Sequence, residues 1–72
     1  MSADLSPRER EVLERAALGR SNGQIAAELG VTVNTVKFHL ASIFRKLGVA
    51  NRTAAATAYV RMAARDDEHL AP

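Results

Sequence analysis

Cysteine is absent from this sequence of 72 residues, which excludes disulfide bridges and thiolate metal sites. The two histidines, His39 and His69, lie too far apart in the sequence to indicate a pair of metal ligands. A domain of this size buries only about 60% of the surface that its unfolded chain exposes. The fold must therefore depend on close packing and well-formed helix caps.

A membrane-spanning stretch and a signal peptide are also missing. No apolar run approaches the length of about 18 residues that a membrane span needs, and residues 1–4 lack the basic start and apolar stretch of a signal peptide. We therefore expect a soluble, cytoplasmic protein with no membrane partner.

The sequence shows no grouping of residues that would support catalysis. Its carboxylates are spread over the exposed face of the first expected helix and over the C-terminal residues. No serine is placed near a plausible base, and no glycine-rich phosphate loop follows a strand. We expect a protein that is not an enzyme and whose domain holds no cofactor, no metal ion and no small-molecule ligand.

Acidic residues are lacking from a long central part of the chain. The net charge is only +2, but residues 29–65 carry six bases and no acid, whereas residues 66–72 carry three acids and no base. A positive field of this extent favours a polyanion such as nucleic acid as partner. The same residues could also form an ordinary solvated surface, and charge alone does not decide between the two.

Start and stop signals along the chain predict an all-α fold of four helices. Two serines stand three residues before Glu or Gln, the spacing of a capping box, and three glycines are placed to end helices. The expected helices cover residues 7–18, 22–29, 33–47 and 52–64. We expect one domain over 1–65 and an acidic, frayed tail over 66–72.

The expected helices 22–29 and 33–47 are separated by a short connection that contains Gly30. A short helix, a tight turn with glycine and a longer amphipathic helix are typical of the helix-turn-helix motif, whose second helix enters the major groove of DNA. An ordinary helical hairpin uses the same spacing. Spacing and charge together favour the DNA-binding interpretation.

The expected helix 33–47 has two faces of different chemistry. At about 100° per residue, Val36, Leu40, Ile43 and Leu47 share one narrow face that should pack in the core. The opposite face is polar and cationic, yet it also carries a phenylalanine, Phe38. An aromatic residue where solvent is expected indicates a binding surface.

Three residues on this outer face have side chains suited to DNA bases. Lysine can donate to guanine O6 and N7, and an apolar side chain can contact a thymine methyl group. We therefore predict base contacts by Lys37 and Phe38, with Ala41 permitting close approach or touching a methyl group itself. Phe38 could instead dock on another protein or fold down beside Arg45.

Contacts to the DNA backbone are predicted at the start of this helix and on either side of it. A helix N-terminus favours an anion, and basic side chains beside the groove set affinity and salt dependence. The residues so predicted are Thr32, Asn34 and Thr35 at the start and Arg45, Lys46 and Arg52 at the flanks.

The expected helix 52–64 is rich in alanine. Its core side is predicted to include Val60. Its outer strip of small residues consists of Thr53, Ala54, Thr57, Ala58 and Arg61. Such a strip lets a second copy approach closely and predicts a homodimer interface. The alanines could equally be present for helix propensity alone.

Three segments closely resemble the DNA-binding domain of LuxR-type transcription regulators, also described as the NarL/FixJ or GerE-like group. They are LSPREREVL, SNGQIAAELGVTVNTVKFHLASIFRKLGV and NRTAA, and the resemblance runs from about residue 5 to residue 62. It implies a four-helix domain that dimerises through its fourth helix on inverted half-sites. By position it implies the same three base contacts and adds Asn22 to the backbone contacts.

This sequence departs from that group at two positions. Ala41 stands where relatives often carry a long polar or basic residue, and Gly23 stands where a lysine or an acidic residue is usual. Fewer hydrogen bonds to bases are then available.

Together these features predict a sequence-specific, dimerising transcription regulator that binds double-stranded DNA. It would be a stand-alone regulator or the C-terminal effector domain of a response regulator or of a quorum-sensing-type regulator, with RNA polymerase as a further candidate partner. Two alternatives stay open, namely a helical protein-interaction module and a promoter-recognition domain like that of a sigma factor.

Overall fold

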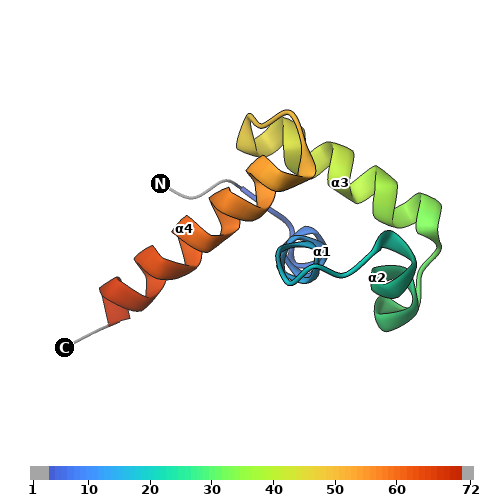
Figure 1. Cartoon of the computed structure of the whole chain (residues 1–72), viewed down its shortest axis with the longest axis horizontal. Helices are drawn as coiled ribbons and strands as arrows, with labels where there is room; N and C mark the ends of the chain where they lie inside the picture. The colour runs from blue at the N-terminus through green and yellow to red at the C-terminus, as the bar shows by residue number, and fades with distance from the viewer. Residues whose placement is uncertain (1–3, 71–72) are drawn as a thin grey trace.

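The computed structural model describes the backbone of residues 4–70 and the side chains of residues 4–65. Its elements are α1 (Pro7–Ala17), α2 (Asn22–Leu29), α3 (Val33–Leu47) and α4 (Arg52–Leu70), with no strand in the described part of the chain. Helix α1 packs against each of the other three helices, and α4 extends away from the cluster (Figure 1). The predicted all-α, four-helix fold is confirmed.

Side chains at the helix starts satisfy backbone N–H groups that the helices themselves leave without a partner. The Ser6 and Ser21 side chains accept from the backbone N–H groups of Glu9 and Gln24, and those two side chains accept from the serine N–H groups in return. Both predicted capping boxes are therefore present. Helix α1 ends one residue before the expected position.

Helix α4 is longer than the sequence indicated. It ends at Leu70 rather than at residue 64, so the backbone over 66–70 is helical and the expected end of this helix was wrong. The acidic composition was the signal for an end, but acidic side chains oppose the C-terminal dipole only weakly, and no glycine or proline occurs between Arg52 and Pro72. The side chains of 66–70 and all of 71–72 lie outside the described residues, and the domain boundary at 65 stays a prediction.

The core is built from apolar side chains of all four helices. Its buried members are Val12, Leu13, Ala16, Ile25, Ala26, Val36, Leu40, Ile43 and Ala55. The predicted core face of α3 is confirmed, with Leu47 packed against the buried cluster. Val60 was expected on the core side but is 59% exposed, because it lies on the outer side of α4.

The connection between α2 and α3 depends on Gly30. This residue has φ 69° and ψ 35°, a left-handed conformation that favours glycine. The Val31 N–H then donates to the Ala26 carbonyl at 3.0 Å, and Thr32 caps α3. Only three residues separate the two helices, so α3 starts directly beside the end of α2 (Figure 1).

Replacing Gly30 with alanine should lower the free energy of unfolding by about 1 to 2 kcal/mol, because an L-residue in the left-handed region is disfavoured by that amount. A Cβ at Gly30 would meet no atom within 4 Å, so the backbone conformation alone sets the cost. Urea unfolding followed by circular dichroism measures it.

The matched control is Gly23→Ala. Gly23 does not have a positive φ, and a Cβ there would meet only Ser21 Oγ at 3.9 Å. This change should leave stability unchanged or raise it by up to about 1 kcal/mol. Equal losses at Gly23 and Gly30 would contradict the explanation.

Candidate nucleic-acid interface

The outer face of α3 is formed by residues that the sequence analysis assigned to DNA. Lys37, Phe38 and Ala41 are all exposed, as are Asn34 and Arg45. Phe38 is 75% exposed, more than any other large apolar side chain described. The structure therefore brings the three predicted base contacts together on one solvent-facing surface.

The Phe38 ring is not folded into the protein. It makes an edge-to-face contact with the neighbouring His39 ring, with 6.4 Å between ring centroids and 63° between ring planes. Such pairs are favourable by about 0.5 to 1.5 kcal/mol. His39 thus supports the base of an aromatic side chain that otherwise faces solvent.

Basic side chains divide into those held by the fold and those left at the surface. Arg8, Arg15, Arg20 and Lys46 each form an ion pair with a glutamate. Over residues 4–65, no such pair includes Lys37 or Arg45. The positive charge on the outer face of α3 is therefore uncompensated, as a phosphate-binding surface requires.

The two threonines at the start of α3 bond to each other. Thr32 Oγ1 accepts from the Thr35 N–H at 3.1 Å, and the two hydroxyl oxygens lie 2.9 Å apart. Each hydroxyl has one hydrogen, so one of them donates to the other. One O–H donor of the pair is left for a phosphate.

Glu9 is buried, although the sequence analysis placed the carboxylates of α1 on its exposed face. Its Oε1 accepts from the Ser6 N–H at 2.8 Å and from Lys46 Nζ at 2.8 Å, and its Oε2 accepts from Ser42 Oγ at 2.6 Å. Burial without partners would be costly for a carboxylate, and these donors offset that cost. Glu9 therefore ties α1 to α3, which corrects the expectation.

The partners of Glu9 also lower its pKa. The Lys46 and Ser42 hydrogen bonds and the Ser6 backbone bond shift the pKa of this carboxyl from 4.5 to about 2, against the opposite effect of burial. Lys46 Nζ additionally donates to the Asp4 carbonyl at 3.2 Å. Lys46, a predicted phosphate contact, thus has partners inside the fold.

Asn22 and Arg52, two further predicted backbone contacts, bind each other. Arg52 Nη1 donates to Asn22 Oδ1 at 2.5 Å, and its Nη2 donates to the Arg20 carbonyl. Both side chains are half-buried. This contact joins the start of α4 to the start of α2, and the sequence analysis had not paired the two residues.

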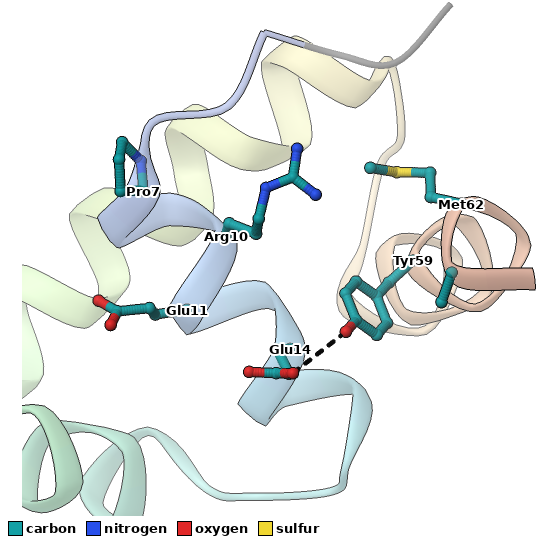
Figure 2. A pocket seen from close by; sticks show the side chains of 7 residues that line it. Pro7, Arg10, Glu11, Glu14, Tyr59 and Met62 are labelled. Carbon is teal, nitrogen blue, oxygen red and sulfur yellow. Dashed lines mark hydrogen bonds between the residues drawn. The ribbon is translucent and has the colours of Figure 1, made fainter. Parts of the chain in front are cut away.

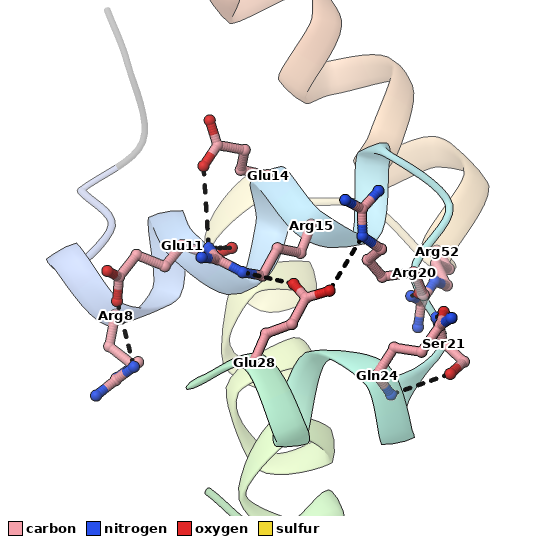
Figure 3. Close-up of polar contacts among 9 residues, drawn as sticks. All are labelled: Arg8, Glu11, Glu14, Arg15, Arg20, Ser21, Gln24, Glu28 and Arg52. Carbon is pink, nitrogen blue, oxygen red and sulfur yellow. Dashed lines mark hydrogen bonds and ion pairs between the residues drawn. The ribbon is translucent and has the colours of Figure 1, made fainter. Parts of the chain in front are cut away.

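A second polar cluster joins α1 to α2. Glu28 accepts from Arg15 Nε at 3.0 Å and from Arg20 Nε at 3.2 Å (Figure 3). Arginines on either side of one carboxylate fix α2 against α1 and the turn between them. Glu28 and Ser42 are therefore structural partners that sequence reasoning missed.

A signal for the Glu9 site was present in the sequence. Ser42 and Lys46 are four residues apart, so they share a face of α3 at the edge of its apolar stripe. Polar residues in that position often bond across to a neighbouring helix. Their carboxylate partner lies more than thirty residues away in the chain, and sequence spacing could not identify it.

The predicted dimer strip lies on α4. Thr53, Thr57 and Arg61 are exposed, and Ala54 and Ala58 are half-buried within the monomer. Val60, which was expected in the core, adds an exposed apolar side chain near this strip.

A shallow hollow of about 300 Å³ lies between α1 and α4. Its lining residues are Pro7, Arg10, Glu11, Glu14, Tyr59, Met62 and Ala63. The Tyr59 hydroxyl donates to Glu14 Oε2 at 3.3 Å across it (Figure 2). None of the residues predicted to contact DNA or a second copy lines this hollow.

The described residues contain no group of three or more histidine or acidic side chains that could hold a metal ion. No helix in this part of the chain is long and apolar enough to cross a membrane.

Comparison with known families adds to this geometry. The family described as "Bacterial regulatory proteins, luxR family" matches residues 3–59, which is most of the chain. The chain belongs to this luxR family. Membership confirms the resemblance seen in the sequence, together with the helix-turn-helix and DNA-binding transcription regulation as the class of function. The family consists of regulators rather than enzymes.

Curated relatives of this luxR-family chain are transcription regulators by name. It is 53% identical over 57 residues to a probable transcriptional regulatory protein NarL of Mycobacterium tuberculosis, a match that covers 79% of this chain and 26% of that protein. It is 50% identical over 56 residues to the probable transcriptional regulatory protein SgaR of Hyphomicrobium methylovorum, covering 78% and 26%. The chain spans about a quarter of the length of these relatives.

Two solved structures have the same fold. The response regulator ChrA of a heme-sensing two-component system is similar with a TM-score of 0.78 and 48% identity, over 86% of this chain and 31% of that one. The transcription factor GerE is similar with a TM-score of 0.75 and 30% identity, over 82% of this chain and 88% of that one.

The buried carboxylate predicts an acid-sensitive fold. The folded-state pKa of Glu9 is about 2 and its ordinary value is 4.5, so its contribution to stability is complete above pH 5 or so and is lost as the pH falls toward 2. Glu9→Gln keeps the size and the cap acceptor, as Gln24 shows in α2, but loses the charge. It should lower the free energy of unfolding at pH 7 by about 1 to 3 kcal/mol.

The measurement is urea unfolding of both chains between pH 7 and pH 2. The difference between them should shrink as the wild-type carboxyl is protonated. Glu11→Gln is the matched control, because the Glu11 side chain is about half exposed and, within residues 4–65, its one ion pair is with Arg8 at 3.4 Å. A Glu9 difference that persists unchanged at pH 2 would refute the electrostatic explanation.

Proposed function

We propose that this chain reads a specific double-stranded DNA sequence with α3 in the major groove. One observation carries the proposal, namely that Phe38 is 75% exposed on the same face as Lys37 and Arg45, two cations without an ion-pair partner among residues 4–65. An exposed aromatic ring is unfavourable in water, and unpaired cations attract phosphates. Both features are accounted for when this face lies against DNA.

Base readout is assigned to three residues. Lys37 donates to guanine O6 or N7, and Phe38 contacts a thymine methyl group. Ala41 lies one helical turn beyond Lys37 and is small and exposed, so it lets the helix approach closely. This chain therefore depends more on apolar contacts and less on hydrogen bonds than a chain with a long polar residue at that position.

Backbone contacts are assigned to the start and the flank of α3. Asn34 is exposed, one hydroxyl of the Thr32–Thr35 pair is left to donate, and Arg45 is exposed. Asn22 lies at the start of α2 and adds a contact there. Lys46 and Arg52 already bond to other groups of the protein, so we expect them to contribute less to direct binding of DNA phosphates.

Dimerisation is proposed through the outer strip of α4 (Thr53, Ala54, Thr57, Ala58 and Arg61) with Val60 beside it. Two copies related by a two-fold axis would bury these small residues and read inverted half-sites. In the cytoplasm such a regulator acts on transcription, and RNA polymerase is the further partner that this role implies.

The exposed apolar side chains favour one second candidate. A helical protein-interaction module could bury Phe38 and Val60 on another protein. Such a module would not need the unpaired Lys37 and Arg45, so this alternative ranks below DNA reading. It predicts that neutralising both cations leaves its binding unchanged.

Selection of bound duplexes from a random pool tests the proposal. Specific reading should enrich one short motif, and its repeat would give half-site spacing and symmetry in the same experiment. Equal affinity for selected and random duplexes at physiological salt would show that the chain is no specific reader.

Substitutions on the α3 face should separate the two kinds of base contact. Lys37→Ala should weaken binding of the selected duplex by about 1 to 3 kcal/mol and relax the preference at one base pair. Phe38→Ala should weaken it by removing contact with a methyl group, so replacing the contacted thymine by uracil should cost wild type affinity but cost Phe38→Ala none.

Titration of fluorescent duplexes at constant salt measures these affinities. Arg8→Lys serves as the charge-conserving control, because Arg8 pairs with Glu11 on α1 and is outside the assigned contacts. If thymine and uracil duplexes bind wild type equally well, Phe38 does not read a methyl group.

A charge at Val60 should disrupt the dimer. In a two-fold interface Val60→Glu places two like charges close together, and this should reduce association and lower affinity for paired half-sites while half-site binding is retained. Analytical ultracentrifugation with and without DNA measures the association of the two copies. Leu18→Glu is the matched control, because Leu18 is also exposed, at 63%, but lies at the end of α1. Unchanged association of Val60→Glu would argue against this interface.

A further inference from the structure

Helix α4 is connected to the start of α2 through a single polar side chain. The two helices do not pack against each other in the described part of the chain. Arg52 nevertheless donates to the Arg20 carbonyl and to Asn22 Oδ1. These two acceptors flank Ser21, the N-cap of α2, and Figure 3 shows Arg52 beside Arg20 and Ser21.

The chemistry of this contact fixes the orientation of the Asn22 amide. Arginine only donates hydrogen bonds, so the amide atom that faces Arg52 is the oxygen. The amide nitrogen is then on the opposite branch and can donate two hydrogen bonds. No acceptor among the described residues receives a bond from it.

The surroundings of Asn22 suit an anion. The capping box uses the Gln24 N–H, whereas the N–H groups of Asn22 and Gly23 are among those that the helix leaves without a partner. Gly23 has no side chain to cover them, and a Cβ there would meet only Ser21 Oγ at 3.9 Å. A phosphate could therefore approach the Asn22 amide nitrogen and these N–H groups together.

We propose that Arg52 is a positioning residue, which turns the NH₂ group of Asn22 toward a DNA phosphate at the start of α2 rather than binding the phosphate itself. The inference rests on the proposed DNA-reading function. The sequence predicted Asn22 and Arg52 as two separate backbone contacts. Under this proposal they form one contact, in which Asn22 binds the phosphate and Arg52 orients Asn22.

Arg52→Lys tests this proposal, because lysine keeps the positive charge but cannot hold both acceptors in the fixed geometry of a guanidinium. Affinity for the selected duplex should fall roughly three- to tenfold, the scale of one hydrogen bond. The slope of log affinity against log salt should stay the same, since no phosphate-bound charge is lost. Arg8→Lys, an arginine outside the assigned contacts, should bind as wild type does.

A double-mutant cycle with Asn22→Ala separates positioning from direct contact. If Arg52 acts through Asn22, the double variant should lose no more affinity than Asn22→Ala alone. Independent phosphate contacts would give losses that multiply. All variants are compared at a temperature where circular dichroism shows them fully folded, so a role in stability alone would leave their affinities equal.

The outcomes distinguish this inference from the proposed function. Failure of the wild-type chain to prefer any duplex would overturn the function itself. Specific binding by wild type with full affinity in Arg52→Lys, or in Asn22→Ala, would overturn only the inference. Multiplying losses in the cycle would make Arg52 a direct phosphate ligand and would overturn it as well.

Discussion

The buried carboxylate of Glu9 is the interaction on which the placement of α3 depends. It caps α1 through Ser6 and accepts from Ser42 and Lys46 on α3, so one group both starts the first helix and holds the third. A buried charge without donors costs several kcal/mol, so α3 packs on α1 only at the rotation that brings Ser42 and Lys46 to it. That rotation leaves Phe38 on the outside.

The bases of this domain therefore serve two purposes that their sequence positions do not reveal. Arg15, Arg20 and Lys46 neutralise carboxylates between helices and stabilise the fold. Lys37 and Arg45 form no such pair within residues 4–65 and leave their charge to the surface. A basic composition indicated a polyanion as partner, and the pairing shows that two of the bases without an ion pair within residues 4–65, Lys37 and Arg45, lie on the outer face of α3.

Local signals were enough to predict most of the fold. Capping boxes, glycines and the apolar stripe of α3 gave four helices, a helix-turn-helix and the outer face that carries Lys37, Phe38 and Ala41. Contacts between distant residues could not be predicted, because the partners of Glu9 and of Arg52 depend on how the helices pack. The misplacement of Val60 and of the end of α4 has a related cause, since an alanine-rich helix has a weak apolar stripe and no residue that stops it.

The same distant contacts determine how the two proposed surfaces could influence each other. The outer strip of α4 would meet a second copy, and α2 and α3 would meet DNA, and Arg52 makes the hydrogen bonds that join the start of α4 to the start of α2 within the described residues. A contact of hydrogen bonds is directional, whereas apolar packing tolerates sliding. A rotation of α4 on dimerisation would therefore act on the Asn22 amide as well as on the core, and affinity for one half-site would then depend on whether the second copy is in place.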